Sequence, residues 1–151
     1  MKKGIRLDIG CGAAKNKGFV GMDQRDLPGV DIVHNIEETP YPLEDESCLC
    51  IVGSHIWEHI KPWKTIEVMN ELWRIMVPGG ELALSMPYGV NDLFVMDPTH
   101  CNPSNAATWQ YFDPEWPLWQ IYQPKPWAIE KGFPVYQVTG IMEVLLRKRE
   151  C

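Results

Sequence analysis

The sequence contains no apolar run of the roughly 20 residues that a membrane-spanning helix needs. It has no Cys-x-x-Cys pair, and nothing else in it has the spacing that is typical of a zinc site. Basic residues are scarce, since 14 Lys and Arg stand against 20 Asp and Glu and leave a formal net charge of -6. We therefore predict no membrane span and no bound metal, and we expect that nucleic acid is not a partner.

Five cysteines are an odd number, which argues against a framework of disulfides. Met1-Lys2-Lys3 leads directly into a predicted strand, so we expect no secretory leader and predict reduced thiols in a cytoplasmic protein. Cys48 and Cys50 alternate along one predicted strand and are expected to be packing residues. The length of 151 residues predicts one domain, residues 1–151.

The most informative local feature is an apolar run, Ile5–Ile9, that ends in Gly10-Cys11-Gly12. This pattern predicts a buried parallel strand with a sharp turn at its carboxyl end. Glycine tolerates positive φ there and, because it lacks a Cβ, lets a ligand lie against bare backbone. Open α/β sheets bind ligands at the carboxyl ends of their strands, so we expect a nucleoside-containing cofactor at this turn.

Further short apolar runs predict the other strands of an α/β sheet. The first two links between them are short, so either the crossover helix is reduced to a turn, which we favour, or these strands are not simple parallel neighbours. One face of the sheet would then be thinly covered, which makes a homodimer a candidate assembly. The predicted strands are residues 19–22 with Asp23 at the end, 31–34, 47–52, 81–86, and 135–139 with 141–146 as a hairpin through Gly140.

Apolar residues at spacings of three and four predict an amphipathic helix over residues 62–76, which Pro78-Gly79-Gly80 ends. Prolines and aromatic residues are dense over residues 88–127, where residues 105–112 predict a short helix. We expect residues 88–127 to form an ordered insertion over the strand ends, without a core of its own.

Three polar residues follow or interrupt the predicted strands. Asp8 lies inside the first strand, where a buried carboxylate needs partners, and it either braces the glycine turn or meets a ligand's ammonium group. Asp23 ends the second strand and is expected to accept hydrogen bonds from both hydroxyls of a ribose, the alternative being a surface turn residue. Asn35, after the third strand, carries an amide that suits a purine edge and equally suits a loop cap.

The glycine turn differs from the fingerprint of dinucleotide-binding sheets, because Lys15 stands where that fingerprint has its third glycine. A pyrophosphate also needs the amino terminus of a helix directly after the turn, and the short link scarcely provides one. These differences argue against an NAD-dependent oxidoreductase and favour a cofactor without phosphates.

The chain resembles a small class I S-adenosylmethionine-dependent methyltransferase of the compact type found in phages and bacteria. The resemblance extends from the first strand to about His100, with its motifs in the family's order and at its spacing. It implies a Rossmann-like, mostly parallel sheet of about seven strands, with the last strand antiparallel and the early helices reduced. The motifs are residues 7–12 (LDIGCG), 17–23 (KGFVGMD), 34–37 (HNIE), 41–47 (YPLEDES), 54–59 (SHIWEH), 71–80 (ELWRIMVPGG) and 97–100 (DPTH).

The resemblance also implies where S-adenosylmethionine would lie. The glycine turn, with Asp8 beneath it, would lie along the methionine moiety, and Asp23 would accept hydrogen bonds from the ribose hydroxyls. The family more often has aspartate at the place of Asn35, and often an acid at the place of Leu49. The remaining implied contacts are Met22 and Gln24 beside the adenine, Asn35 and Ile36 along its edge, Gly10, Cys11 and Gly12 in the turn, and Ser54 and His55 near the methyl group or the substrate.

Methyl transfer from a sulfonium needs alignment and exclusion of water more than an electrophile made by the protein. An oxygen or nitrogen acceptor also needs a base, and histidine suits that role because it titrates near neutrality. We predict His100 as the base, with His55 as the second candidate, and we expect His59 to be structural.

The aromatic rings of the insertion are predicted to form a wall for a small-molecule substrate. Alternatively, they cap the exposed end of the sheet or form a subunit contact. A non-catalytic S-adenosylmethionine-binding regulator or partner subunit is the second functional hypothesis, because the binding motifs are clearer than any base.

Overall fold

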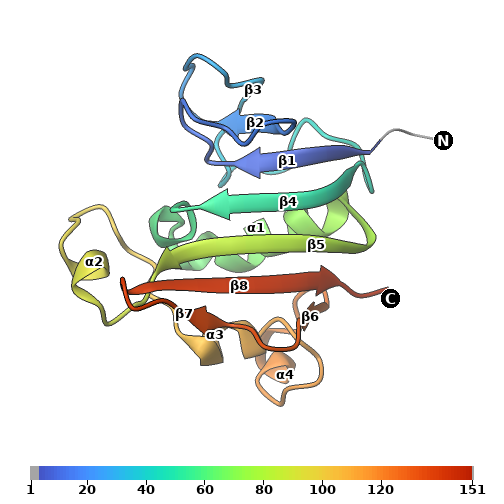
Figure 1. Ribbon diagram of the computed structural model, residues 1–151. Coiled ribbons are helices and arrows are strands. Elements are labelled where there is room, and N and C mark those ends of the chain that lie inside the picture. The colour runs from blue at the N-terminus through green and yellow to red at the C-terminus, as the bar shows by residue number, and fades with distance from the viewer. Residues whose placement is uncertain (1–3, 151) are drawn as a thin grey trace.

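The computed structural model describes residues 4–150, so the predictions made from Met1-Lys2-Lys3 fall outside the described residues. Within them the chain forms one eight-stranded sheet, in which β7 pairs only with β8 and the other strands lie in the order β3-β2-β1-β4-β5-β8-β6 (Figure 1). The strands are β1 (Ile5–Ile9), β2 (Val20–Asp23), β3 (Ile32–Val33), β4 (Cys48–Ser54), β5 (Met76–Pro87), β6 (Trp127–Ile129), β7 (Val135–Tyr136) and β8 (Ile141–Lys148).

The sheet is mostly parallel, as predicted. Strands β1 to β5 run parallel to one another, and β8 runs antiparallel to β5 along its edge. β1 lies between β2 and β4, with Ile9 opposite Met22 on one side and Gly53 on the other. The strand order therefore reverses beside β1, which is the place where open α/β sheets form a crevice for a ligand.

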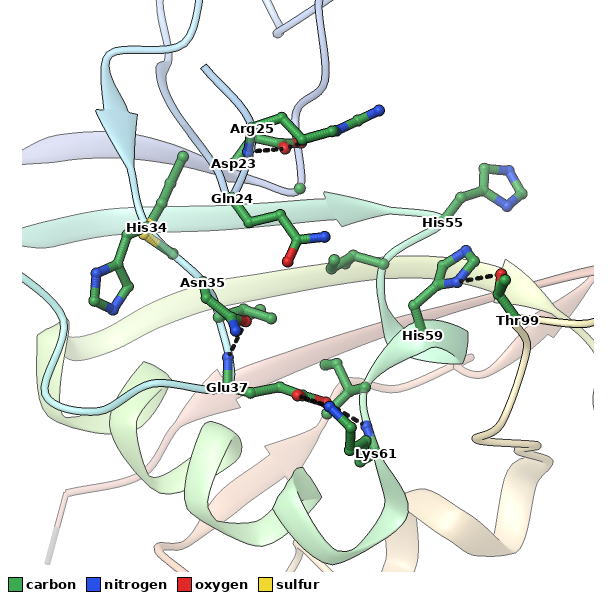
Figure 2. A pocket seen from close by; sticks show the side chains of 15 residues that line it. Asp23, Gln24, Arg25, His34, Asn35, Glu37, His55, His59, Lys61 and Thr99 are labelled. Atoms are coloured by element: carbon green, nitrogen blue, oxygen red, sulfur yellow. Dashed lines mark hydrogen bonds and ion pairs between the residues drawn. The ribbon is translucent and has the colours of Figure 1, made fainter. Parts of the chain in front are cut away.

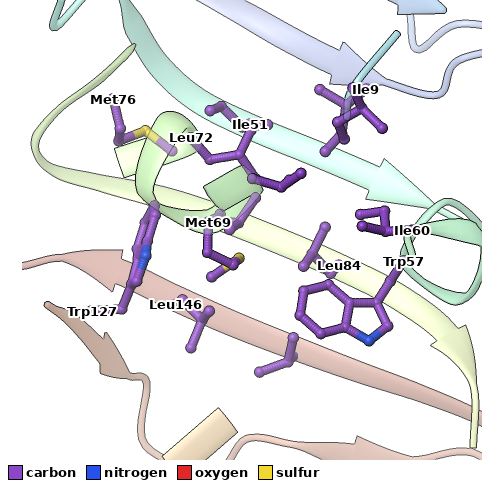
Figure 3. Close-up of a cluster of buried hydrophobic side chains, with 14 of the residues drawn as sticks. Ile9, Ile51, Trp57, Ile60, Met69, Leu72, Met76, Leu84, Trp127 and Leu146 are labelled. Atoms are coloured by element: carbon purple, nitrogen blue, oxygen red, sulfur yellow. The ribbon is translucent and has the colours of Figure 1, made fainter. Parts of the chain in front are cut away.

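One helix, α1 (Thr65–Ile75), packs against one face of the sheet and forms the core with it. Side chains of β5 and β8 alternate along each strand, so that Leu84 and Leu146 point to the buried face together with Met69 and Leu72 of α1 (Figure 3). This alternation follows from the two-residue period of a strand, and the spacing on α1 follows from the 3.6-residue period of a helix. The sequence predicts the helical spacing of α1, and it predicts β5 and β8 from their apolar runs.

The opposite face of the sheet is thinly covered. In Figure 1, α1 lies behind β4 and β5, and the described residues place no helix in front of these strands. The links of residues 10–19 and 24–31 contain turns and no helix, so the predicted reduction of the early helices is confirmed. β1 and β2 are direct parallel neighbours all the same. The homodimer that this bare face suggested stays a prediction.

The structure differs from the prediction at several strand ends. β5 begins at Met76, so Pro78-Gly79-Gly80 lies inside the strand, and an irregular register opposite Cys48 and Cys50 accommodates it. The three-residue strand β6 was not predicted, because its pairing with β8 depends on a partner distant in sequence. The hairpin through Gly140 is present, although β7 is shorter than the predicted strand.

The insertion of residues 88–127 contains three short helices, α2 (Asp92–Val95), α3 (Ala106–Gln110) and α4 (Trp119–Tyr122). Trp109 of α3 is fully buried against Trp57, with ring centroids 4.5 Å apart. Trp57 belongs to the 3-10 turn η1 (Trp57–His59), which follows β4 and precedes a second turn, η2 (Pro62–Lys64). The insertion thus shares the core of the sheet.

A partly buried ion pair on α1 also binds the loop that follows β3. Glu71 accepts hydrogen bonds from Arg74 and from the backbone N–H of Tyr41, each at 2.6 Å. The hydroxyl of Tyr41 in turn donates to the carbonyl of Ile36 at 2.8 Å. Burial would raise the pKa of Glu71, but the hydrogen bonds from Arg74 and Tyr41 outweigh it and hold the pKa below its ordinary value.

We expect Glu71→Gln to lower the free energy of unfolding at neutral pH by about 1–3 kcal/mol, because a charged hydrogen-bond acceptor is lost. A carboxyl whose pKa is depressed on folding stabilises the protein above its unfolded pKa, about 4.3, and this stabilisation is lost as pH falls through the folded pKa. The difference between wild type and variant should therefore shrink in acid. Urea unfolding over this pH range is the measurement, with exposed Glu150→Gln as the control, and a difference independent of pH would contradict the assignment.

Candidate functional site

A cavity of about 540 Å³ opens at the carboxyl ends of β1, β2 and β3, beside the turn that follows β4 (Figure 2). Seven of the residues predicted for the site line it, namely Gly10, Met22, Asp23, Gln24, Asn35, Ile36 and His55. Five others, Asp8, Cys11, Gly12, Ser54 and His100, are not among its lining residues. Eight further residues line the cavity without having been predicted for the site: Arg25, His34, Glu37, Ile56, His59, Ile60, Lys61 and Thr99.

The glycine turn forms one wall of the cavity. Gly10 and Gly12 have φ angles of +63° and +54°, in the left-handed region that favours glycine. A Cβ on Gly10 would lie 2.9 Å from the side chain of Ile56, so a larger residue would meet both strain and a clash. The backbone N–H groups of Gly10 and Cys11 donate to the carbonyl of Met22, which holds the turn against the end of β2.

Asp8 braces this turn from below. Its Oδ2 accepts hydrogen bonds from the backbone and the side-chain amide of Asn16, at 2.8 and 2.9 Å. The carboxylate is 5% exposed and does not line the cavity. Of the two alternatives that the sequence left open for Asp8, loop bracing is the one that these contacts support.

Asp23, the last residue of β2, places a carboxylate on the cavity wall. Its Oδ2 accepts from the backbone N–H of Gly12 at 2.9 Å, and its Oδ1 accepts from Arg25, both backbone and side chain. Burial would raise the pKa of Asp23, but the hydrogen bonds from Arg25 and Gly12 outweigh it and lower the pKa. The group is therefore an anion at neutral pH, and it links the glycine turn to the end of the second strand.

The loop after β3 forms the opposite wall. Asn35 accepts from the backbone N–H of Glu37 at 3.0 Å, so its oxygen caps the loop, while its amide nitrogen is held only weakly, 3.5 Å from Glu38. Glu37 pairs with Lys61, whose backbone N–H and ammonium donate to it at 2.7 and 2.6 Å. The Glu37–Lys61 pair joins this loop to the segment after η1 and closes the cavity on that side (Figure 2).

His55 lies where β4 ends, at the cavity edge, and has a φ of +55°. Non-glycine residues adopt this left-handed conformation infrequently, and such strain is concentrated at functional sites. Nδ1 of His55 lies 3.2 Å from Oε1 of Glu58, whose side chain is 1% exposed, whereas the ring of His55 is half exposed. The arrangement is an exposed imidazole held by a buried carboxylate.

His100, predicted as the base, lies behind this pair. Its side chain is 8% exposed, its Nδ1 donates to the carbonyl of Phe94 at 2.9 Å, and its Nε2 lies 4.0 Å from Glu58. His59, expected to be structural, lines the cavity instead, with its Nδ1 3.2 Å from the hydroxyl of Thr99. Glu58 and His59 lie three and four residues after His55 along the chain, and that proximity was the available signal for this group.

The aromatic insertion contributes little to the cavity wall. Of residues 88–127, only Thr99 is among the lining residues, and Trp109 and Phe112 are buried against Trp57. This packing agrees with the alternative that the rings cap the end of the sheet. Ser54 also faces elsewhere, since its hydroxyl accepts from Ser85 at 3.1 Å and lines a separate cavity of about 340 Å³ on the bare sheet face.

Comparison with solved structures identifies the fold. An S-adenosylmethionine-dependent methyltransferase from Archaeoglobus fulgidus superposes with a TM-score of 0.68, at 16% identity, over 97% of this chain and 87% of that one. The fold is that of the class I methyltransferases. A chain from a Haloferax volcanii complex, described as the Trm112 methyltransferase activator with "the putative methyltransferase", matches similarly, with a TM-score of 0.65 and 11% identity over 99% of this chain and 85% of that one.

At the level of sequence the relationship is more distant. A Mycolicibacterium smegmatis protein named "Probable S-adenosylmethionine-dependent methyltransferase" is 24% identical over 160 residues. The match covers 91% of this chain but 57% of that protein, so the chain spans little more than half of the relative's length. No family model matches the chain. The methyltransferase resemblance seen in the sequence is thus confirmed at the level of the fold.

Proposed function

We propose that this chain binds S-adenosylmethionine in the cavity of about 540 Å³ and transfers its methyl group to an oxygen or nitrogen atom of a small molecule. The observation that carries the proposal is the pairing of bare backbone at Gly10 with the anionic Asp23 on one cavity wall, at the point where the strand order reverses. The class I methyltransferase fold and the name of the M. smegmatis relative support the same cofactor.

The residues present fit this cofactor in chemistry. Asp23 offers acceptor oxygens for ribose hydroxyls, and Gly10 offers a surface without a side chain for the methionine portion. Met22 and Ile36 supply apolar surface for a purine, and the weakly held amide of Asn35 supplies a donor at its edge. When bound, S-adenosylmethionine supplies a methyl group that its sulfonium already activates.

A dinucleotide fits less well. Lys15, which replaces the third glycine of the dinucleotide fingerprint, forms an ion pair with Asp31 at 2.5 Å. No helix begins after the turn in residues 10–19, so no helix amino terminus is available there for a pyrophosphate. Both features favour a cofactor without a pyrophosphate.

We assign the base to His55 in place of His100, because His55 lines the cavity and His100 does not. His55 takes the proton of the acceptor atom as the methyl group arrives, while Glu58 holds the ring through Nδ1. A buried carboxylate that orients an exposed imidazole stabilises the imidazolium formed in this step. The other tasks of the protein are alignment of acceptor and methyl group and exclusion of water.

The second hypothesis is a cofactor-binding chain without catalysis, acting as a regulator or partner subunit. The H. volcanii structural neighbour was solved as a complex of two proteins, which supports a protein partner for this fold and leaves the question of catalysis to experiment. No helix within residues 4–150 is long and apolar enough to cross a membrane. The described cysteines Cys11, Cys48, Cys50 and Cys101 are free thiols, in keeping with the proposed cytoplasmic location.

Calorimetry with S-adenosylmethionine and with NAD tests the cofactor assignment. We expect binding of S-adenosylmethionine alone, and Asp23→Ala should weaken it by about 1–3 kcal/mol, because charged hydrogen bonds to the ribose are lost. The matched control is Asp26→Ala, since Asp26 is exposed, lies three positions further along and does not line the cavity. Binding of NAD alone would refute the cofactor, and unchanged affinity of Asp23→Ala would refute the ribose contact.

A further inference from the structure

We propose that Glu58, His59 and His100 form a binding site for a divalent transition-metal cation of the zinc class at the rim of the cavity. One ligand atom from each residue lies within 4.8 Å of the other two. The sequence predicted no metal, because Glu58-His59 and His100 are separated by η2, α1, β5 and α2 and show no metal-ligand spacing. The inference concerns the described side chains alone and does not depend on methyl transfer.

The backbone holds the two parts of this cluster together. The carbonyl of Glu58 accepts hydrogen bonds from the N–H groups of Cys101 and Asn102, at 2.8 and 3.1 Å. These bonds attach the segment that carries His100 to the turn η1. The hydroxyl of Thr99 lies 3.2 Å from Nδ1 of His59 and donates to Asp97 at 2.7 Å, which restrains the His59 ring. The ligand atoms are therefore positioned by structure on both sides of the site.

His100 has the protonation pattern of a metal ligand. Its Nδ1 lies 2.9 Å from the carbonyl of Phe94, and because a carbonyl only accepts, Nδ1 carries the proton. In the neutral ring Nε2 then has a lone pair, and this atom faces Oε1 of Glu58 at 4.0 Å and Oδ2 of Asp97 at 3.5 Å. A lone pair that faces two carboxylates at these distances leaves room for a metal ion between Nε2 and the carboxylate oxygens. A backbone carbonyl behind Nδ1 is also a common support for metal-bound histidine.

Glu58 provides a second, independent observation. The residue is 1% exposed, and its Oε2 has no hydrogen-bond partner. Buried polar atoms are nearly always paired, because leaving one unpaired costs free energy. His55 contacts only Oε1 of this carboxylate. A cation bound by Glu58 would satisfy the carboxylate that the protein leaves incompletely paired.

The ligand set determines the class of ion. Two imidazoles and one carboxylate, without a thiolate, suit zinc and neighbouring first-row cations, whereas magnesium and calcium prefer all-oxygen sites. Three protein ligands leave coordination positions open, as in sites where the metal also binds water or substrate. His59 and Thr99 line the cavity, so an open position on this side would face the cavity.

The test is titration of the full chain, without S-adenosylmethionine, with Zn²⁺ by calorimetry and with Co²⁺ by visible absorption. We expect one Co²⁺ bound per chain, with ligand-field bands and no thiolate charge-transfer band. His59→Ala and Glu58→Gln should each weaken binding by about 100-fold or more, since each removes a direct ligand. His34→Ala is the matched control because His34 lines the cavity away from the cluster, and Cys101→Ser excludes the nearby thiol.

Zn²⁺ or Co²⁺ binding that persists in His59→Ala and Glu58→Gln would overturn the site. The absence of Zn²⁺ and Co²⁺ binding to the wild type would overturn it as well. His59 is exposed, so its variant tests the site even if Glu58→Gln fails to fold. Calorimetry of S-adenosylmethionine with His100→Ala, which removes a ligand that does not line the cavity, separates this inference from the proposed function. Loss of Zn²⁺ binding with intact cofactor affinity supports the metal site whatever the outcome for methyl transfer.

Discussion

Replacing Trp57 with alanine should lower the free energy of unfolding by about 3–5 kcal/mol, the cost of removing a large buried aromatic side chain. Trp57 is 1% exposed and packs against both Trp109 and Phe112, with ring centroids 4.5 and 6.3 Å away. These contacts join the turn η1 to the insertion. The cavity left by the substitution would therefore loosen the segment that carries Thr99 and His100 as well as the core.

Urea unfolding followed by circular dichroism measures this loss. Trp57→Phe is the informative companion, because it keeps an aromatic ring and removes an indole N–H that has no hydrogen-bond partner. It should recover most of the stability lost in the alanine variant. A loss below about 1 kcal/mol for Trp57→Ala would mean that the insertion is held to the sheet by other contacts.

Replacing His55 with alanine should slow methyl transfer by about 100- to 10,000-fold, the usual contribution of a general base, while leaving cofactor affinity intact. His55→Gln should be similarly slow, because an amide can keep the hydrogen bond to Glu58 but cannot take the proton. The measurement first needs an acceptor, which a screen of small metabolites, sugars and peptides with a labelled methyl donor would identify. Calorimetry with S-adenosylmethionine is the control for the cofactor.

Turnover at the wild-type rate in His55→Ala would remove His55 as the base. The same assay on His100→Ala decides between the two histidines that the sequence proposed. If the base must line the cavity, methyl transfer by His55→Ala is slow although Glu58 and His100 are still present. A slow His100→Ala beside a normal His55→Ala would shift the requirement from His55 to His100, either as the base or as a ligand of the proposed metal ion.

Much of the fold could be predicted from local pattern. The run Ile5–Ile9 before two glycines, the alternation of β8 and the apolar spacing of α1 each reflect a period imposed by a strand or a helix. The short links correctly indicated that the early helices are reduced to turns. The bounds of β5 and the existence of β6 could not be read this way, because both depend on pairing with partners distant along the chain.

By itself the sequence determined the parallel sheet, the turn at Gly10 and the placing of Asp23 beside it, since residues at the ends of neighbouring strands necessarily meet at one edge. Only the tertiary structure decided which histidine faces the cavity, and that His100 lies against Glu58. Those relations depend on how an insertion packs on a turn far from it along the chain. Such packing cannot be predicted from local periodicity, because the packing depends on side-chain shape and on backbone hydrogen bonds between distant segments.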